Sequence, residues 1–428
     1  MKKLYLIILC FINCIHATEN NIELAISGAA QTQMPLAILV LDNENTQLNQ
    51  IAQTIKNDFD YTGQFQASIK KYSAELPKKE LQHNIKALFM SGTPLALCIS
   101  AESKKSIEWR LYDTMQGTMI AAKKYKKKGS IERGWAHAIA DEVWQALTGN
   151  DGFFSSRIAY CKELKTKKGH SIRNMYVTDF DGTNEELLVE VPTVIVAPRW
   201  HSQKPRLFYS EYTDTNVRLM SVSMKKKRKV ASNFDGINML PCFSKSGKSV
   251  VYCASHGDGN CQLYHYKKGS LECFTKNNGN NVSPIFIDDE RIAFCSDYQT
   301  GNPQIYIGNI KTGHVQRITK GGYCSSPSYC AKNNKLAYHM MVKGRMQIFT
   351  YDFNTKQSAQ LTKGSENKHE SSWSPCGTQL VYSQEHNGSS QIISLNLLTD
   401  KTHYLTNKKD QCSYPQWSPT YPIFPTVT

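Results

Sequence analysis

Residues 241–252, with the sequence PCFSKSGKSVVY, carry a pattern that recurs through the last two-thirds of the chain. A proline comes two positions before an aromatic residue, a small polar turn follows, and an apolar stretch then ends in a second aromatic residue. The first aromatic residue, here Phe243, returns every 43 or 44 positions. The six anchors of this repeat are Trp200, Phe243, Phe286, Tyr329, Trp373 and Trp417. A repeat of about 40 to 50 residues with several short strands is typical of β-propeller blades.

Two further positions keep the register of the anchors. A proline stands two residues before five of them, at Pro198, Pro241, Pro284, Pro327 and Pro415. A polar residue opens a later strand of five units, at Arg218, Gln262, Gln304, Gln347 and Gln391. Because three kinds of position share one period, the sequence predicts six blades.

The two ends of the repeat indicate how the ring closes. No proline–aromatic segment precedes the first strand of the repeat region, at 157–160. Residues 414–419, YPQWSP, provide such a segment at the other end of the chain. We therefore expect an all-β six-bladed propeller over residues 151–428, closed by its C-terminal strand, which removes the last open sheet edge.

Residues 18–150 do not follow the repeat. Helical stripes, a helix N-cap at Asn45 and three strand patterns between 95 and 125 predict a small α/β domain. We expect its helices on one face of the sheet. The stretch 147–152 contains two glycines and no apolar periodicity, which indicates a domain boundary.

The N-terminus has the features of a secretory signal peptide. Lys2 and Lys3 precede the apolar run 4–12, and Ala17 offers a cleavage point, so the expected signal peptide is residues 1–17. We expect no transmembrane segment after its removal, because no other apolar run reaches about 18 residues. The formal net charge is +15 at pH 7, but an exported protein rarely meets nucleic acid, and we expect none as a partner.

Thirteen cysteines are present, and Cys10 and Cys14 lie in the expected signal peptide. The remaining number is odd, so at least one thiol is free even where disulfides can form. We expect buried free thiols in the strands, with a hairpin disulfide between Cys253 and Cys261 as the alternative.

No catalytic motif is evident. The chain has no G-x-S-x-G elbow, P-loop or C-x-x-C motif, and Trp373 stands where the metalloprotease pattern begun by His369-Glu370 needs a second histidine. We therefore predict no enzyme, catalytic residue, cofactor or metal site. Recognition is instead expected in the loops before the inner strands, which ring closure gathers at one mouth of the central channel.

Several segments resemble the TolB family of the Tol-Pal system. They are AHAIADEV at 136–143, LTG at 147–149, GF at 152–153, RIAY at 157–160, DFDGTN at 179–184 and PQWSP at 415–419. The resemblance runs through nearly the whole chain after the signal peptide. It implies an N-terminal α/β domain, a six-bladed propeller and a binding role in the periplasm without catalysis.

The resemblance also implies two partners and a monomeric scaffold that supports envelope integrity and outer-membrane constriction at cell division. The mature N-terminus, about residues 18–28, would bind a TolA-like inner-membrane protein, and the propeller mouth would bind the lipoprotein Pal. The expected residues of the first site are Ile22, Leu24, Ile26, Ser27 and Gly28. Those of the second are Asn238, Met239, Leu240, Asn281, Val282, Ser283, Ser325, His369 and Glu370.

Two other functions stay open at this point. The propeller of a prolyl-oligopeptidase-like hydrolase would need a catalytic domain, and the residues outside the repeat lack the serine elbow. A binder of a small molecule or cell-wall polymer would need charged or aromatic residues on the inner strands. These strands look mostly apolar and small, which favours a protein ligand at the mouth.

Overall fold

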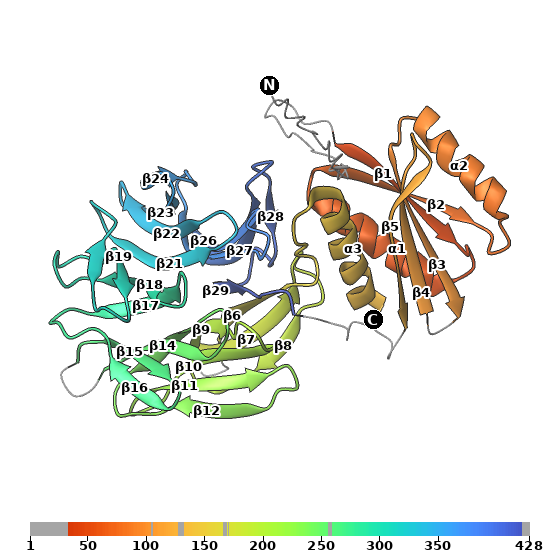
Figure 1. Ribbon diagram of the computed structural model, residues 1–428. Coiled ribbons are helices and arrows are strands. Elements are labelled where there is room, and N and C mark those ends of the chain that lie inside the picture. The colour runs from red at the N-terminus through yellow and green to blue at the C-terminus, as the bar shows by residue number, and fades with distance from the viewer. Residues whose placement is uncertain are drawn as a thin grey trace, which may run out of the picture.

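The computed structural model describes residues 33–103, 106–126, 132–165, 169, 171–255 and 259–421. Within these residues the chain forms a mixed α/β domain and a β-propeller, packed side by side (Figure 1). The expected signal peptide with Ala17, and the segment 18–28 with its five expected TolA-site residues, lie outside the described residues. None of the described helices has both the length and the apolar character that a membrane crossing requires.

The N-terminal domain is built on one five-stranded sheet with the order β2-β1-β3-β4-β5. β1 pairs in parallel with β2 and β3, and the other pairs are antiparallel. Asn45 caps α1 as predicted, because its side chain accepts the Leu48 N–H at 3.1 Å. The elements are β1 (Met34–Leu41), α1 (Thr46–Tyr61), β2 (Phe65–Tyr72), α2 (Lys78–Met90), β3 (Leu95–Ser103), β4 (Ser106–Asp113), β5 (Thr118–Lys126) and α3 (Glu132–Thr148).

The helices cover both faces of this sheet, so the expectation of a single covered face is wrong. Ile55 of α1 and Ile139 of α3 share a core with Ile38 of β1, whereas Ile85 of α2 packs with Leu39 on the opposite face. The strand order explains the difference. The chain runs from β1 to β2 on one side of β1, and it then crosses over β1 to β3 on the other side. Because the two crossovers run in opposite directions and both are expected to be right-handed, α1 and α2 lie on opposite faces of the sheet.

The propeller has six four-stranded sheets, which confirms the predicted number of blades. The order β29-β6-β7-β8 shows that the C-terminal strand completes the first blade, as predicted. Blade 1 comprises β29 (Cys412–Trp417), β6 (Arg157–Lys165), β7 (Ser171–Asp179) and β8 (Glu186–Val189). Blade 2 comprises β9 (Ile195–Trp200), β10 (Arg206–Tyr212), β11 (Val217–Ser223) and β12 (Arg228–Ser232). Blade 3 comprises β13 (Asn238–Phe243), β14 (Ser249–Ala254), β15 (Gln262–Lys267) and β16 (Ser270–Cys273).

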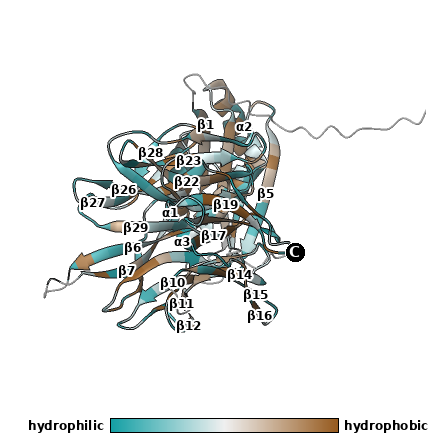
Figure 2. Cartoon of the chain, turned by 90° about the vertical axis from the view of Figure 1, so that its left-hand side faces the viewer, coloured by the Kyte–Doolittle hydropathy of each residue, from teal (hydrophilic) through white to brown (hydrophobic). Residues whose placement is uncertain are grey.

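The last three blades repeat this arrangement, and neighbouring inner strands contact one another around the whole ring. Blade 4 comprises β17 (Asn281–Phe286), β18 (Arg291–Ser296), β19 (Gln304–Asn309) and β20 (Val315–Arg317). Blade 5 comprises β21 (Cys324–Cys330), β22 (Lys335–Val342), β23 (Arg345–Asp352) and β24 (Gln357–Gln360). Blade 6 comprises β25 (Asn367–Trp373), β26 (Gln379–His386), β27 (Ser389–Asn396) and β28 (Thr402–Tyr404). Figure 2 shows hydrophobic stretches within the strands and hydrophilic residues in many of the connecting loops.

The periodic residues hold the blades together in two ways. The Trp200 indole donates to the Gln416 carbonyl and the Trp373 indole to the Ser328 carbonyl, each at 3.0 Å and each in the preceding blade. The periodic glutamines instead fix the loop that leads into the next blade. Gln304 Nε2, for example, donates to the carbonyls of Gly321 and Gly322 at 2.8 and 2.6 Å. The Trp200 and Trp373 anchors therefore bond to the preceding blade, and Gln304 bonds to the loop that leads into the next one.

The cysteines follow the expectation of free thiols. All eleven of those from Cys98 to Cys412 are unpaired, and ten of them are buried. Cys253 and Cys261 are not joined. Burial raises the pKa of most of these thiols, for example that of Cys242 to about 12, and so keeps them protonated and unreactive.

Candidate functional site

All six inner strands begin at the same end of the ring, and we call this end the mouth. Each inner strand has a β-bulge there, in which one residue takes a left-handed backbone conformation with φ between 52° and 58°. The six residues are Ala197, Leu240, Ser283, Ser326, Glu370 and Tyr414. A bulge disrupts the ladder locally, so its backbone groups can bond outside their own blade.

The predicted residues Asn238 and Asn281 serve the blades themselves. Both are completely buried at the first position of an inner strand. The Asn238 side chain accepts the Phe234 N–H at 3.3 Å and donates to the Val217 carbonyl at 3.1 Å. Asn281 makes an equivalent set of bonds, including one to the Gly279 carbonyl at 3.0 Å. Their amides hold the loops before the inner strands in place.

The other predicted positions on blades 3 to 5 are mostly covered. Met239 and Val282 are half-buried and pack against the core between blades 3 and 4. Leu240 is half-buried, and Ser283 and Ser325 each keep 9% of their surface exposed. The structure therefore places all these residues at the mouth but leaves each of them little surface.

His369 and Glu370 lie in a charged network at the start of β25. His369 Nε2 is 3.2 Å from Glu385 Oε1, and its Nδ1 is 3.7 Å from Glu370 Oε2. The same Glu370 oxygen accepts the Tyr414 N–H at 2.7 Å, a bond from blade 6 to blade 1. His339 Nδ1 lies 3.4 Å from the Glu370 N–H, whose proton it accepts.

The protonation of this network follows from burial and neighbouring charge. Burial lowers the pKa of His369, but its hydrogen bonds to Glu370 and Glu385 outweigh that effect and raise the pKa to about 9. Burial and the charge of His369 lower the pKa of His339 to about 4. At neutral pH the mouth therefore contains one imidazolium held between two carboxylates, beside one neutral histidine that accepts a backbone proton.

The inner strands are less apolar than the sequence suggested. Arg199 of β9, His369 and Glu370 of β25 and Tyr414 of β29 all belong to them. Burial lowers the pKa of the Arg199 guanidinium, and the Glu370 charge opposes that shift. The description as mostly apolar and small fits the inner strands of blades 3 to 5 and is wrong for blades 6, 1 and 2.

Five exposed apolar side chains lie at the same end of the ring, on blades 2 to 5, and the sequence interpretation missed them. They occupy strand ends and loops at the mouth, and 37% to 54% of their surface is exposed. They are Tyr212, Phe234, Tyr298, Tyr323 and Met341. Three of them could have been found, because Phe234, Tyr298 and Tyr323 are lone aromatic residues in loops rich in Gly, Asn and Ser. We call these five residues the apolar rim.

The N-terminal domain lies at the opposite end of the ring. Asn396 at the β27–β28 turn donates to the Thr62 carbonyl at 2.7 Å, and Lys332 at the β21–β22 turn pairs with Asp151 at 2.9 Å. Both turns lie at the end where the inner strands finish. The N-terminal domain therefore does not cover the apolar rim. A polar cleft of about 460 Å³, lined by Asn367 and Glu385 of blade 6, also lies at the mouth.

No metal site is apparent among the residues that the structure describes. No group of three or more His, Cys, Asp or Glu side chains there is arranged to hold an ion. The residues at the mouth offer hydrogen bonds, charge and apolar surface, which are the means by which proteins recognise other proteins.

Comparison with known proteins agrees with both domains. Residues 144–421 match the family described as the TolB beta propeller domain, and residues 22–120 match the TolB amino-terminal domain. The Tol-Pal system protein TolB of Francisella tularensis subsp. tularensis (strain FSC 198) is 24% identical over 410 residues, covering 90% of this chain and 91% of that protein. The protein of the same name from Gluconobacter oxydans (strain 621H) is 28% identical over 242 residues, covering 56% and 51%.

A solved structure shows the same fold. The crystal structure of TolB from Acinetobacter baumannii superposes with a TM-score of 0.76 at 22% identity, covering 91% of this chain and 97% of that one. Domain order, six blades and closure by the last strand are thus accompanied by a family match over more than half of the residues. The chain belongs to the TolB family.

Proposed function

We propose that this protein is a non-enzymatic periplasmic scaffold of the Tol-Pal system. In this role it binds the lipoprotein Pal at the propeller mouth and a TolA-like inner-membrane protein through its mature N-terminus. Such a bridge would support envelope integrity and outer-membrane constriction at cell division. Membership of the TolB family and the two-domain architecture support the role.

The apolar rim, at the same end of the ring as a charged network, is the observation that carries the proposal. Aromatic residues and Met are enriched in protein interfaces, and the rim places four aromatic side chains and one Met at one end of the ring. A few aromatic side chains usually supply most of the binding energy of such a site. The His369–Glu370–Glu385 network behind the rim fixes charge and hydrogen-bonding groups, which select the partner.

The two binding sites can be separated by a pull-down from solubilised cell envelopes. The baits are the mature protein, the protein without residues 18–28, and a Tyr298→Ala, Tyr323→Ala variant. We expect the mature protein to recover both partners, the truncated protein only the lipoprotein, and the rim variant only the TolA-like protein. Recovery of neither partner by the mature protein would refute the scaffold role.

A further inference from the structure

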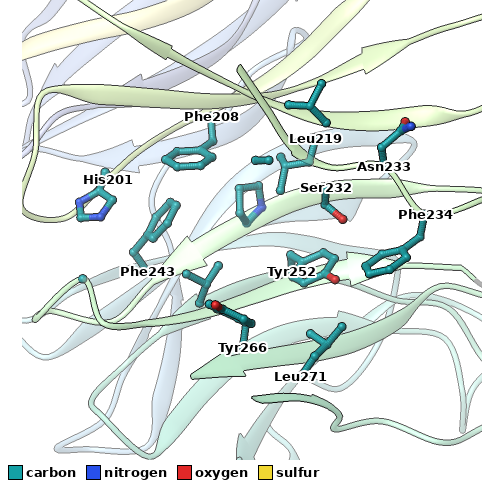
Figure 3. A pocket seen from close by; sticks show the side chains of 15 residues that line it. His201, Phe208, Leu219, Ser232, Asn233, Phe234, Phe243, Tyr252, Tyr266 and Leu271 are labelled. Atoms are coloured by element: carbon teal, nitrogen blue, oxygen red, sulfur yellow. The ribbon is translucent and has the colours of Figure 1, made fainter. Parts of the chain in front are cut away.

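A second apolar feature lies away from the polar centre of the mouth, in a groove between blades 2 and 3. Its volume is about 710 Å³, and residues of strands β10 to β16 line it; Figure 3 shows their side chains. It runs from His201, at the end where the inner strands finish, to Phe234 of the apolar rim. Aromatic and aliphatic side chains line it, including Phe208, Val230, Phe243, Tyr252, Tyr266 and Leu271.

The groove has no charge. None of the described residues that line it is Asp, Glu, Lys or Arg. His201 is its one histidine, and burial together with the nearby Lys204 and Arg206 charges lowers the pKa of that ring. Val230, Tyr266 and Leu271 are 54%, 46% and 40% exposed, so the groove is open to a ligand. Its occupant should therefore be an uncharged apolar segment.

The C-terminal part of the chain passes one end of the groove. After β29 the chain reaches Tyr421, whose hydroxyl donates to the His201 carbonyl at 2.6 Å. The Tyr421 ring also lies 6.0 Å from the Trp200 ring. The ring of the same His201 lies 4.8 Å from the Phe243 ring inside the groove, in a tilted arrangement. Whatever follows Tyr421 thus starts beside the groove.

The seven residues that follow are chemically suited to it. Residues 422–428 read PIFPTVT and contain no charged side chain. Pro422 and Pro425 give the PxxP spacing of segments that bind aromatic-lined grooves in an extended polyproline conformation. Phe424 is the third residue after Tyr421, and three extended residues span about 10 Å, which lets its side chain reach the end of the groove beside His201.

We infer that the groove between blades 2 and 3 binds residues 422–428 of the same chain, with Phe424 as the apolar anchor. Binding within one chain needs no second molecule, because Tyr421 already holds the segment at the groove entrance. The tether gives a high effective concentration, so even a weak intrinsic affinity suffices. Phe234 belongs to both the groove and the apolar rim, so the bound segment would also support the rim.

Photo-crosslinking in the full chain tests this inference. The photoreactive amino acid p-benzoylphenylalanine replaces Phe424, the protein is irradiated at low concentration, and crosslinked peptides are mapped by mass spectrometry. We expect crosslinks within one chain to peptides that contain Phe208, Tyr252 or Leu271. Crosslinks between two copies would overturn the inference in favour of a second molecule as occupant. Crosslinks to other surfaces, or none, would also overturn it.

A matched pair of substitutions shows whether the crosslinks depend on the groove itself. Val230→Glu places a charge in the groove, and we expect the crosslink yield to fall about tenfold, since the bound segment would remove this carboxylate from water without giving it a partner. Val315→Glu is the control, because Val315 is similarly exposed at 42% on the outer strand of blade 4. Equal yields from the two variants would contradict the inference. Leu271→Glu repeats the test in case Val230→Glu fails to fold.

Discussion

At the scale of single residues, His137 of α3 lies between a carboxyl group of each domain. Its Nδ1 lies 2.8 Å from Asp58 of α1, and its Nε2 lies 3.6 Å from Asp179 at the end of β7. Arg133, one turn earlier on α3, also contacts Asp179 at 2.6 Å. Burial lowers the pKa of His137, but the two carboxylates outweigh burial and raise the pKa to about 9. Burial raises the pKa of Asp58 to about 7.

These shifts predict a stability that falls at alkaline pH. Both groups hold their proton more tightly in the folded state, whereas unfolded His and Asp have pKa values of about 6.5 and 3.9. The His137 contribution is therefore complete below about pH 6.5 and is lost as the pH rises through about 9. We expect the free energy of unfolding in urea to fall by up to about 3 kcal/mol over this range.

The variant His137→Gln isolates this contribution. It removes the titrating group, so its stability should change less between pH 6.5 and pH 9 than that of the parent. Thiols also begin to titrate in unfolded chains toward pH 9, and the comparison cancels this shared effect. If the free energy of unfolding changed equally with pH in the parent and the variant, His137 would not be the cause of the pH dependence.

At the scale of elements, the periodic glutamine is the device that shapes the mouth loops. In blade 4, Gln304 donates to two carbonyls of the following loop and accepts from the Thr319 hydroxyl at 2.8 Å. The Thr319 hydroxyl in turn accepts the Ile305 N–H at 2.9 Å. Gln347 with Thr362 makes the same bonds in blade 5. Gln304, at the start of β19, thus fixes the loop that contains Tyr323 of the apolar rim.

The substitution Gln304→Ala should therefore destabilise the protein. It leaves the carbonyls of Gly321 and Gly322 without their partner, at a cost of about 1–3 kcal/mol in the free energy of unfolding. Gln316→Ala on the exposed strand β20 is the control and should be neutral. Urea unfolding of the two variants makes the comparison, and equal stabilities would mean that the glutamine only fills space.

The sequence predicted the elements that repeat and missed features that depend on one place in the fold. The positions of Trp417 and Gln304 recur at fixed spacing, so the closing strand and the start of β19 were predicted from the period, whereas the bonds from Gln304 to the following loop were not. The face covered by α2 depends on the strand order around β1, which helix periodicity does not contain. Glu370 and His339 meet only because neighbouring blades pack together, and Tyr298 joins the apolar rim only when the ring closes.

At the scale of the whole molecule, blade 1 is made from residues 157–189 and from a strand more than 220 positions later. Trp417 of that strand is 3% exposed, and its indole donates to the Ser156 hydroxyl at 2.6 Å. Its ring also contacts Phe153, part of a core cluster that continues into the N-terminal domain. Ring closure and domain attachment therefore depend on the same residue.

Replacing Trp417 should weaken both the closure of the ring and the attachment of the N-terminal domain. We expect Trp417→Ala to lower the free energy of unfolding by about 3–5 kcal/mol, because it removes a buried ring and leaves a cavity. Tyr404→Ala removes an aromatic side chain that is 62% exposed in blade 6 and should have little effect. Thermal unfolding followed by circular dichroism compares them. A loss no larger for Trp417→Ala than for Tyr404→Ala would contradict the closure by β29.

The central claim, that the mouth of the closed ring binds the lipoprotein, is tested by calorimetry with the soluble domain of Pal. Tyr298→Ala and Tyr323→Ala each remove one side chain of the apolar rim, and each should weaken binding about tenfold. Tyr404→Ala, which removes a more exposed ring on the outer strand β28 of blade 6, should bind like the parent. Unchanged binding by both rim variants, or equal weakening by Tyr404→Ala, would contradict a binding site at the mouth.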